Sequence, residues 1–230
     1  MDISPRLKTI AEKVSYRTVA DIGTDHGYIP IYLAEKGLID RAAACDINKG
    51  PLLRAESNIK KYGFEDIVEV RLGDGLKPVE EDEFESLVIA GMGGMLIIDI
   101  LKNSLEYVVG VKQLVLQPQL DLIAVRRFVH SIGFKIVDEE YIFDDNKYYT
   151  VLSCIQGRDS VYDCADYIFG KVAIEKKDSM LKNYILFEIG KNIKILKNIK
   201  DAAKGTQPAR EKAKEVEKYI DICYEVLKCL

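Results

Sequence analysis

The sequence lacks the features of metal-binding, disulfide-linked and membrane-spanning chains. Its five cysteines include no C-x-x-C pair and are odd in number, so neither a zinc site nor a disulfide framework is predicted. The longest apolar run, Leu87–Ile98, is too short to cross a bilayer and contains three glycines. Residues 1–10 hold no apolar signal core. We therefore expect a cytoplasmic protein that needs no metal.

An excess of positive charge is also missing from the chain as a whole, whose formal net charge is −4. This excludes a uniformly basic nucleic-acid-binding protein. The charge is unevenly distributed, however. Residues 171–214 contain twelve Lys or Arg against five Asp or Glu, a local charge of +7, which leaves −11 for the rest of the chain. The pattern predicts a basic appendage on an acidic body.

The order of apolar patterns predicts an α/β domain. Short apolar runs typical of strands alternate with helical patterns, and this alternation indicates parallel strands joined by crossover helices. The expected strands span residues 18–22, 42–46, 68–72, 86–90, 113–116, 134–141 and 148–154. The expected helices span residues 4–14, 28–37, 50–62, 94–108 and 119–131.

The end of the chain departs from that pattern. The last two strands are joined by the polar turn 143–147, which has no room for a helix, so we expect an antiparallel hairpin at one edge of the sheet. Beyond it, residues 160–204 and 208–229 have helical periodicity and are separated by a turn at 204–208. Their apolar stripes predict a coiled-coil-like helical hairpin. The expected domains are a Rossmann-like domain, 1–157, and a helical domain, 158–230.

The strongest local signal is the segment Asp21-Ile22-Gly23-Thr24-Asp25-His26-Gly27. A buried strand ends there in a glycine-bearing turn, and a helix follows, which lets a ligand approach free backbone N–H groups. The spacing is not the G-x-G-x-x-G of NAD enzymes. Asp21 and Asp25 disfavour a pyrophosphate and favour a cofactor with a sulfonium and an amino group. The alternative is a tight strand-to-helix turn without a ligand.

Three further turns follow the next predicted strands. Asp46 ends the second strand, where a carboxylate accepts both ribose hydroxyls of a nucleoside cofactor. Its alternative role is a helix cap, for which Asn48 is better placed. Asp74, before Gly75, is placed to meet an adenine amino group, or belongs to a plain polar turn. Gly91-Met92-Gly93-Gly94 follows the fourth strand and leaves space for a ligand, or is a glycine-rich helix entry without function. Because all four turns share one edge of the sheet, together they predict an adenosine-cofactor site.

These motifs resemble those of the bacterial tRNA adenine-22 N1-methyltransferase (TrmK) family, within the class I methyltransferases. The matching segments are Ser4-Pro5-Arg6-Leu7, Asp21–Pro30, Asp46 with Asn48–Leu52, Gly73-Asp74-Gly75, Ala90–Gly94 and Gln117-Pro118-Gln119. Related enzymes that attack base nitrogens often carry Asn-Pro-Pro-Tyr where Gly91–Gly94 stands here. That departure leaves the residue that clamps the target base unidentified.

The resemblance implies a seven-stranded sheet that holds S-adenosylmethionine, and methyl transfer to N1 of an adenine in tRNA. We expect the cofactor to be bound by Asp21, Gly23, Asp25, His26, Gly27, Asp46, Asp74, Gly75, Gly91, Met92 and Gly93. Asp25, His26 and Tyr28 are the candidate catalytic residues, with Tyr28 stacking on the base and His26 contacting cofactor or base. Alternatively, Tyr28 packs under the loop and His26 caps the helix.

Basic residues provide candidate contacts to RNA. Lys191, Lys194, Lys197, Lys200 and Lys204 recur every three or four residues and so share one helix face. Such a stripe tracks RNA phosphates, although the solvated face of a coiled coil has the same pattern. Further candidates are Arg6, Lys8, Arg126 and Arg127.

Three functions compete at this point. The first is a tRNA methyltransferase, with tRNA as partner and a monomer expected. The second is a methyltransferase for a small molecule or a protein, which has no use for a basic tail. The third is a non-catalytic interaction protein whose Rossmann-like body senses a nucleotide. A dehydrogenase is opposed by the missing glycine motif.

Overall fold

The computed structural model describes residues 1–202 and 206–230. By the density of contacts, the chain divides into two compact units, Met1–Val161 and Tyr162–Leu230. No helix in the described part of the chain has both the length and the apolar content needed to cross a membrane.

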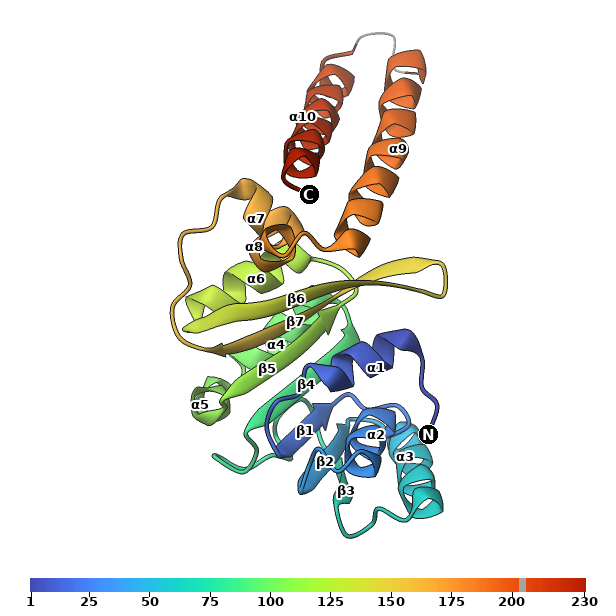
Figure 1. The fold of residues 1–230 in the computed structure, drawn as a ribbon, viewed down its shortest axis with the longest axis vertical. Coiled ribbons are helices and arrows are strands. Elements are labelled where there is room, and N and C mark those ends of the chain that lie inside the picture. The colour runs from blue at the N-terminus through green and yellow to red at the C-terminus, as the bar shows by residue number, and fades with distance from the viewer. Residues whose placement is uncertain (203–205) are drawn as a thin grey trace. The chain divides into compact units, whose positions relative to one another are not determined.

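The first unit is built on a seven-stranded sheet in the order β3-β2-β1-β4-β5-β7-β6 (Figure 1). Strands β3, β2, β1, β4 and β5 are parallel, and β7 pairs antiparallel with both β5 and β6. The bounds are β1 (Thr18–Ile22), β2 (Arg41–Asp46), β3 (Val68–Leu72), β4 (Ser86–Met92), β5 (Gln113–Pro118), β6 (Phe134–Asp144) and β7 (Lys147–Gln156). The predicted Rossmann-like sheet with an antiparallel edge hairpin is confirmed.

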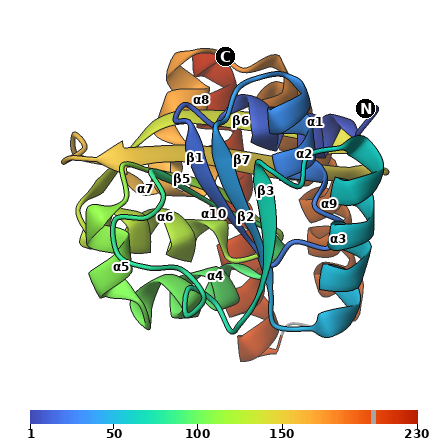
Figure 2. The ribbon, with the colours of Figure 1, turned by 90° about the horizontal axis from the view of Figure 1, so that it is seen from below.

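Helices cover both faces of this sheet (Figure 2). One face carries α1 (Pro5–Glu12), α2 (Tyr28–Glu35) and α3 (Lys49–Tyr62), and the other carries α4 (Gly94–Lys102), α5 (Leu105–Gly110) and α6 (Leu122–Ser131). The single helix expected at 94–108 is therefore two helices. The chain leaves the helical conformation at Ser104, a residue type whose side chain competes with helical backbone hydrogen bonds.

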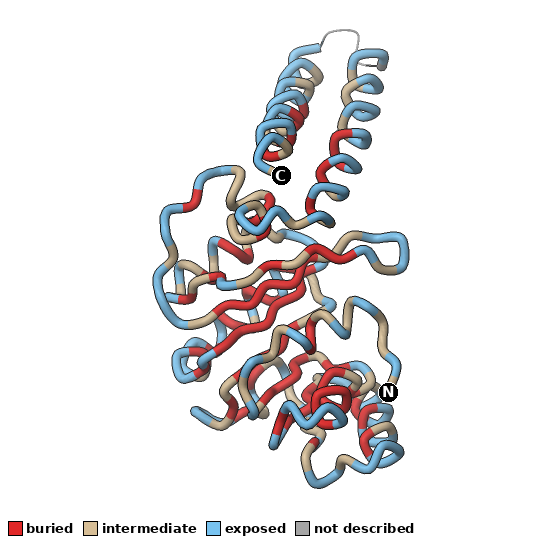
Figure 3. Tube along the Cα trace, viewed as in Figure 1, coloured by how far each residue is buried: buried red, intermediate tan, exposed pale blue. Residues whose placement is uncertain are grey.

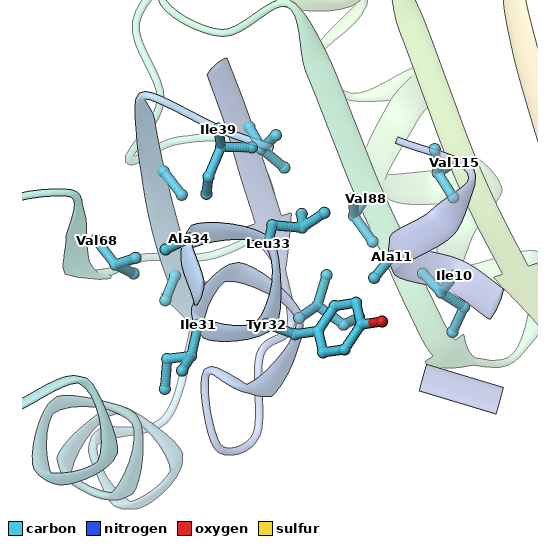
Figure 4. Packing of buried hydrophobic residues seen from close by; sticks show 14 of the residues in the cluster. Ile10, Ala11, Ile31, Tyr32, Leu33, Ala34, Ile39, Val68, Val88 and Val115 are labelled. Atoms are coloured by element: carbon cyan, nitrogen blue, oxygen red, sulfur yellow. The ribbon is translucent and has the colours of Figure 1, made fainter. Parts of the chain in front are cut away.

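The core lies between the helices and the sheet. Buried residues run continuously along the central strands (Figure 3), as expected for parallel strands covered on both faces. Figure 4 shows the α1–α3 side, where Ile10 and Leu33 from two helices pack with Val88 and Val115 from two strands. All four are fully buried, and each such side chain contributes about 1.5–3 kcal/mol of transfer free energy.

The strand order reverses at β1, which pairs with β2 on one side and β4 on the other. The four turns predicted to bind a ligand follow β1, β2, β3 and β4, so they meet at the carboxyl edge of the sheet. Open α/β sheets bind ligands at this edge, beside the reversal in strand order.

The hairpin of β6 and β7 ends at the same edge, because β7 starts where β5 ends. Its two turn residues, Asp145 and Asn146, both have positive φ (46° and 57°). Two left-handed residues give a turn whose twist matches that of the flanking strands, and Asp and Asn tolerate this conformation better than most residues.

The second unit is entirely helical in its described residues. It contains α7 (Cys164–Phe169), α8 (Lys171–Glu175), α9 (Ser179–Ala202) and α10 (Gln207–Cys229). Helices α9 and α10 run antiparallel, side by side (Figure 1), which confirms the predicted hairpin. The expected turn at 204–208 includes Lys204 and Gly205, which lie outside the described residues.

The single helix expected at 160–204 is wrong. Gly170 ends α7 with φ of +89°, and Lys177 is left-handed between α8 and α9. Asp178 then starts α9, because its Oδ1 accepts the N–H groups of Met180 and Leu181 at 2.7 and 3.0 Å. These local caps outweigh the continuous helical propensity of the segment.

Candidate functional site

A cavity of about 410 Å³ opens at the carboxyl edge beside β1 and β4. It is lined by Arg6, Leu7, Asp21, Gly23, Thr24, Asp25, His26, Tyr28, Ile29, Ala90, Gly91 and Gln119. Residues of α1, of the loop after β1, and of the ends of β4 and β5 thus face one space. Five of the predicted cofactor residues, Asp21, Gly23, Asp25, His26 and Gly91, lie together here.

The loop after β1 is held by its backbone. The N–H groups of Gly23 and Thr24 both donate to the carbonyl of Cys45 on β2, at 2.8 and 2.9 Å. The Thr24 hydroxyl accepts the N–H of Gly27 at 3.1 Å. Gly27 has φ of +69°, and a Cβ there would lie 3.3 Å from the Cβ of Ala55. Gly27 therefore lets α2 pack against α3, a reason for glycine that is independent of any ligand.

Asp21 is a buried carboxyl group at the floor of this cavity, with 4% of the residue exposed. Burial raises its pKa to about 6, against the opposing effect of a hydrogen bond with Thr24, and the nearby Asp46 raises it further. Within residues 1–202 and 206–230, no cationic side chain stabilises the charge of Asp21. A cationic ligand group would stabilise the ionised form.

Asp25, His26 and Tyr28 form one continuous group at the mouth of the cavity. The Asp25 carboxylate lies 3.1 Å from His26 Nε2 on one side and 2.5 Å from Arg54 of α3 on the other. The His26 and Tyr28 rings stack with centroids 5.0 Å apart and planes 9° apart. The side chain of His26 is partly exposed, and Asn58 binds its backbone carbonyl at 3.0 Å. Tyr28 thus lines the cavity while its ring packs on His26 of the loop.

A second cavity, of about 160 Å³, adjoins the first at Gly23. Its walls are Ile22, Gly23, Cys45, Asp46, Ile47, Gly73, Asp74, Gly75, Met92, Leu96 and Ile100. The apolar side chains Ile47, Leu96 and Ile100 surround two carboxylates, Asp46 and Asp74. Asp46 Oδ1 accepts the N–H of Asn48 at 2.6 Å, which fixes the carboxylate. Asn48 is the N-cap residue of α3, as expected, and its side chain makes no capping hydrogen bond.

Two glycines near the ends of β1 and β4 have a left-handed backbone. A Cβ at Gly23 would lie 1.9 Å from the Cε of Met92, and Gly23 also has φ of +78°. Gly91 has φ of +77° and sits at a break in the β4–β5 register between Ala90 and Met92. The break is a bulge, a device that commonly redirects backbone next to binding sites.

The basic residues predicted to contact RNA lie in different surroundings. Arg6 lines the first cavity, where its Nη1 donates to Gln117 Oε1 at 2.9 Å and its guanidinium lies over the Tyr149 ring. Lys8 and Arg127 are exposed. The prediction for Arg126 is wrong. That side chain is fully buried, 2.7 Å from the buried Glu139, and a surface contact is therefore out of its reach.

The lysine stripe lies along α9. Lys191, Lys194, Lys197 and Lys200 are all exposed. Lys191 pairs with Glu188 at 3.0 Å and Lys200 with Glu217 at 2.9 Å. Lys194 and Lys197 have no ion-pair partner among the described residues. Lys204, the fifth member, lies outside the residues that the structure describes.

Comparison with known proteins decides the family. Residues 3–152 match a family described as a methyltransferase domain. The chain is 32% identical over 233 residues to the tRNA (adenine(22)-N(1))-methyltransferase of Bacillus subtilis, covering 99% of this chain and 98% of that protein. This chain belongs to the tRNA (adenine(22)-N(1))-methyltransferase family.

Solved structures of methyltransferases of this family share its fold over the full length. The B. subtilis m1A22 tRNA methyltransferase TrmK is 30% identical, with a TM-score of 0.86 over 98% of this chain and 99% of that one. The M. capricolum TrmK, solved with S-adenosylhomocysteine, is 27% identical, with a TM-score of 0.84 over 99% and 98%.

The two cavities of this methyltransferase fit S-adenosylmethionine, the cofactor that its sequence predicts. The smaller cavity has apolar walls against which an adenine can pack. Its Asp46 carboxylate can accept hydrogen bonds from the ribose hydroxyls. The larger cavity offers buried Asp21 and exposed Asp25 to a cationic amino-acid end. Gly23 lies where the two cavities meet, and a side chain there would fill the passage.

Sequence reasoning missed several residues of the site. Arg54, which binds Asp25, lies on α3 without any motif to mark it. The apolar walls of the smaller cavity come from Ile47, Leu96 and Ile100. Ile47 and Leu96 are 61% and 52% exposed, which is unusual for large apolar side chains and cannot be read from the sequence. Gln119 was visible only as part of a family motif.

Proposed function

We propose that this chain transfers a methyl group from S-adenosylmethionine to N1 of an adenine in tRNA, at position 22 as in its relative. The observation that carries the proposal is the pair of adjoining cavities at the carboxyl edge, one apolar with Asp46 and one acidic with Asp21. The family membership of the whole chain supports it. We further propose a cytoplasmic monomer, since its substrate is tRNA and the described helical seam closes within one chain.

The cofactor is proposed to lie across both cavities. When bound, it supplies a methyl group activated by a sulfonium. Asp46 would accept hydrogen bonds from the ribose, and Asp74 with Gly75 would border the adenine. Asp21 and Asp25 would attract the ammonium end, and Gly23, Gly91, Met92 and Gly93 would let the cofactor approach the backbone. Charge-assisted hydrogen bonds of this kind contribute about 1.5–3 kcal/mol each.

The protein's task in the reaction is positioning. Adenine N1 carries a free lone pair at neutral pH, so no side chain has to generate the nucleophile. Holding N1 in line with the methyl group replaces a bimolecular encounter, an effect worth at most about 7–11 kcal/mol. The target base must leave any stack or pair to expose N1. Tyr28, with its ring in the cavity wall, is proposed to stack on that base.

The methylated adenine is cationic, and loss of an N6 proton neutralises it. Asp25, 3.1 Å from His26 at the mouth of the cavity, is the carboxylate placed to accept that proton directly or through water. The variants Tyr28→Ala and His26→Ala test the roles proposed for these two side chains. Both are expected to lower kcat at saturating S-adenosylmethionine, and unchanged turnover in both variants would contradict the assignment.

The helical unit is proposed to hold the tRNA. Lys194 and Lys197 lie exposed on α9 without ion-pair partners among the described residues, which leaves their charges available to phosphates. Replacing both with Gln is expected to weaken tRNA binding and to lower the slope of log Kd against log salt by about 1.5–2. Lys212→Gln is the matched control, because Lys212 on α10 pairs with Glu215. An unchanged slope in the double variant would show that the stripe is only a solvated helix face.

A further inference from the structure

Gln117, near the end of β5, and Gln119, just after it, have opposite surroundings. Gln117 is fully buried, and both polar atoms of its amide are hydrogen-bonded. Its Oε1 accepts from Arg6 at 2.9 Å, and its Nε2 donates to the Pro118 carbonyl at 3.1 Å. Gln119, two residues later, is exposed and lines the cavity that also holds Tyr28 and Gly91. Gln117 is structural, whereas Gln119 presents an amide to the site.

The backbone around Gln119 is fixed on both sides. Its N–H donates to the Met92 carbonyl at 2.8 Å, beyond the bulge at Gly91. The next carbonyl, that of Leu120, accepts the N–H of Gly94 at 3.1 Å. Within residues 1–202 and 206–230, by contrast, the Gln119 side-chain amide makes no hydrogen bond. A rigidly mounted amide without a partner suits a ligand that arrives later.

The position of Gln119 points to the acceptor rather than the cofactor. Asp46 and Asp74 follow β2 and β3, on one side of the reversal in strand order. Gln119 follows β5, on the other side, and lines the larger of the two cavities but not the smaller one. A target base that enters the larger cavity beside the cofactor would meet the wall that contains Gln119.

We propose that Gln119 selects adenine by a bidentate contact to its N6 and N7 atoms; this inference rests on the proposed tRNA methyltransferase function. The amide oxygen accepts an N6 hydrogen, and the amide nitrogen donates to N7, the pairing that amide side chains make with adenine. This contact uses the edge remote from N1 and leaves the N1 lone pair free. Guanine offers an acceptor, O6, where the amide oxygen needs a donor, and its N1 carries a proton.

The test combines variants of Gln119 with an altered target base. Gln119→Ala removes the amide, and Gln119→Glu keeps its size and the N6 contact but removes the donor to N7. Each is assayed on tRNA with adenosine or 7-deazaadenosine at the methylated position, the latter lacking the N7 acceptor. The control measurement is the Kd of S-adenosylhomocysteine for each protein.

For adenosine, kcat/KM is expected to fall about tenfold to hundredfold in Gln119→Ala. In the wild type, 7-deazaadenosine is expected to lower kcat/KM about 3- to 10-fold, the effect of one lost hydrogen bond. Gln119→Ala should not distinguish the two bases. Gln119→Glu should show no penalty for 7-deazaadenosine, and even a preference for it, because a carboxylate oxygen repels the N7 lone pair of adenine. The Kd of S-adenosylhomocysteine should stay within twofold in both variants.

The outcomes distinguish failure of the proposed methyltransferase function from failure of the role proposed for Gln119. A wild-type protein that leaves tRNA unmethylated overturns the proposed function and this inference with it. If the wild type methylates tRNA, the assignment of Gln119 is overturned by variants that keep wild-type kcat/KM or that still penalise 7-deazaadenosine. A tenfold loss of S-adenosylhomocysteine affinity would also overturn it, because Gln119 would then belong to the cofactor site.

Discussion

Asp21→Asn is predicted to stabilise the cofactor-free protein at neutral and alkaline pH. The folded chain buries this carboxyl group and raises its pKa to about 6. In the unfolded chain an aspartate ionises near pH 4. A difference of about two pKa units corresponds to about 3 kcal/mol. The ionised Asp21 therefore lowers the stability of the cofactor-free fold.

The pH dependence of the effect follows from proton binding. Below about pH 4 the carboxyl group is protonated in both states and imposes no penalty. Between about pH 4 and 6 the folded state keeps a proton that the unfolded state releases, so stability falls as pH rises. Above about pH 6 the full penalty is present. Because Asn is neutral throughout, the gain of Asp21→Asn should grow from near zero at pH 4 to as much as about 3 kcal/mol at pH 8.

Urea unfolding followed by far-UV circular dichroism measures this gain at pH 5, 6, 7 and 8. The matched control is Asp66→Asn, a change at an exposed carboxylate expected to stay within about 0.5 kcal/mol at every pH. The same Asp21→Asn protein should bind S-adenosylhomocysteine more weakly, since the cofactor's ammonium loses its counter-charge. A stability gain that does not change with pH would refute the reasoning.

Three further predictions follow from single contacts. Asp46→Ala should weaken S-adenosylhomocysteine binding about 10- to 100-fold by calorimetry, because the ribose loses its charged acceptor; unchanged affinity would contradict the cofactor pose. Arg126→Ala should lower the free energy of unfolding by about 3–5 kcal/mol, because Glu139 is left buried with its charge. Arg158→Ala, at an exposed arginine, should cost less than about 0.5 kcal/mol, and equal losses would show that burial is not the cause. Gly23→Ala should destabilise the fold by about 1–2 kcal/mol through its left-handed backbone, and a neutral effect on the urea midpoint would exclude strain there.

Short sequence patterns predict most of the fold. The strand-to-helix turn at Asp21–Gly27 was recognisable because a buried apolar run, a glycine and a helix start follow one another in sequence. The β6–β7 hairpin was recognisable because no helix fits into its polar turn. By contrast, the breaks at Gly170 and Lys177 depend on two single left-handed residues within a segment of helical periodicity, and periodicity does not report backbone handedness.

The sequence predicts the acidic residues and glycines of the site, but not the tertiary contacts that surround them. Charge and glycine spacing mark Asp21 and Asp46 in the sequence. The burial of Arg126 depends on β6 bringing Glu139 beside α6, a contact that joins separate elements and has no local signature. The ion pair of Arg54 with Asp25 likewise appears only when α3 packs beside the loop after β1. Tertiary contacts of this kind decided which basic residues remain available to RNA.

The central claim is methyl transfer to N1 of a tRNA adenine, and nucleoside analysis tests it most directly. The protein is incubated with methyl-labelled S-adenosylmethionine and bulk bacterial tRNA, and the tRNA is digested to nucleosides. The account predicts label in 1-methyladenosine and none with tRNA whose position 22 is not adenine. Label in another nucleoside, or a tRNA fraction without label while the cofactor binds, would contradict it.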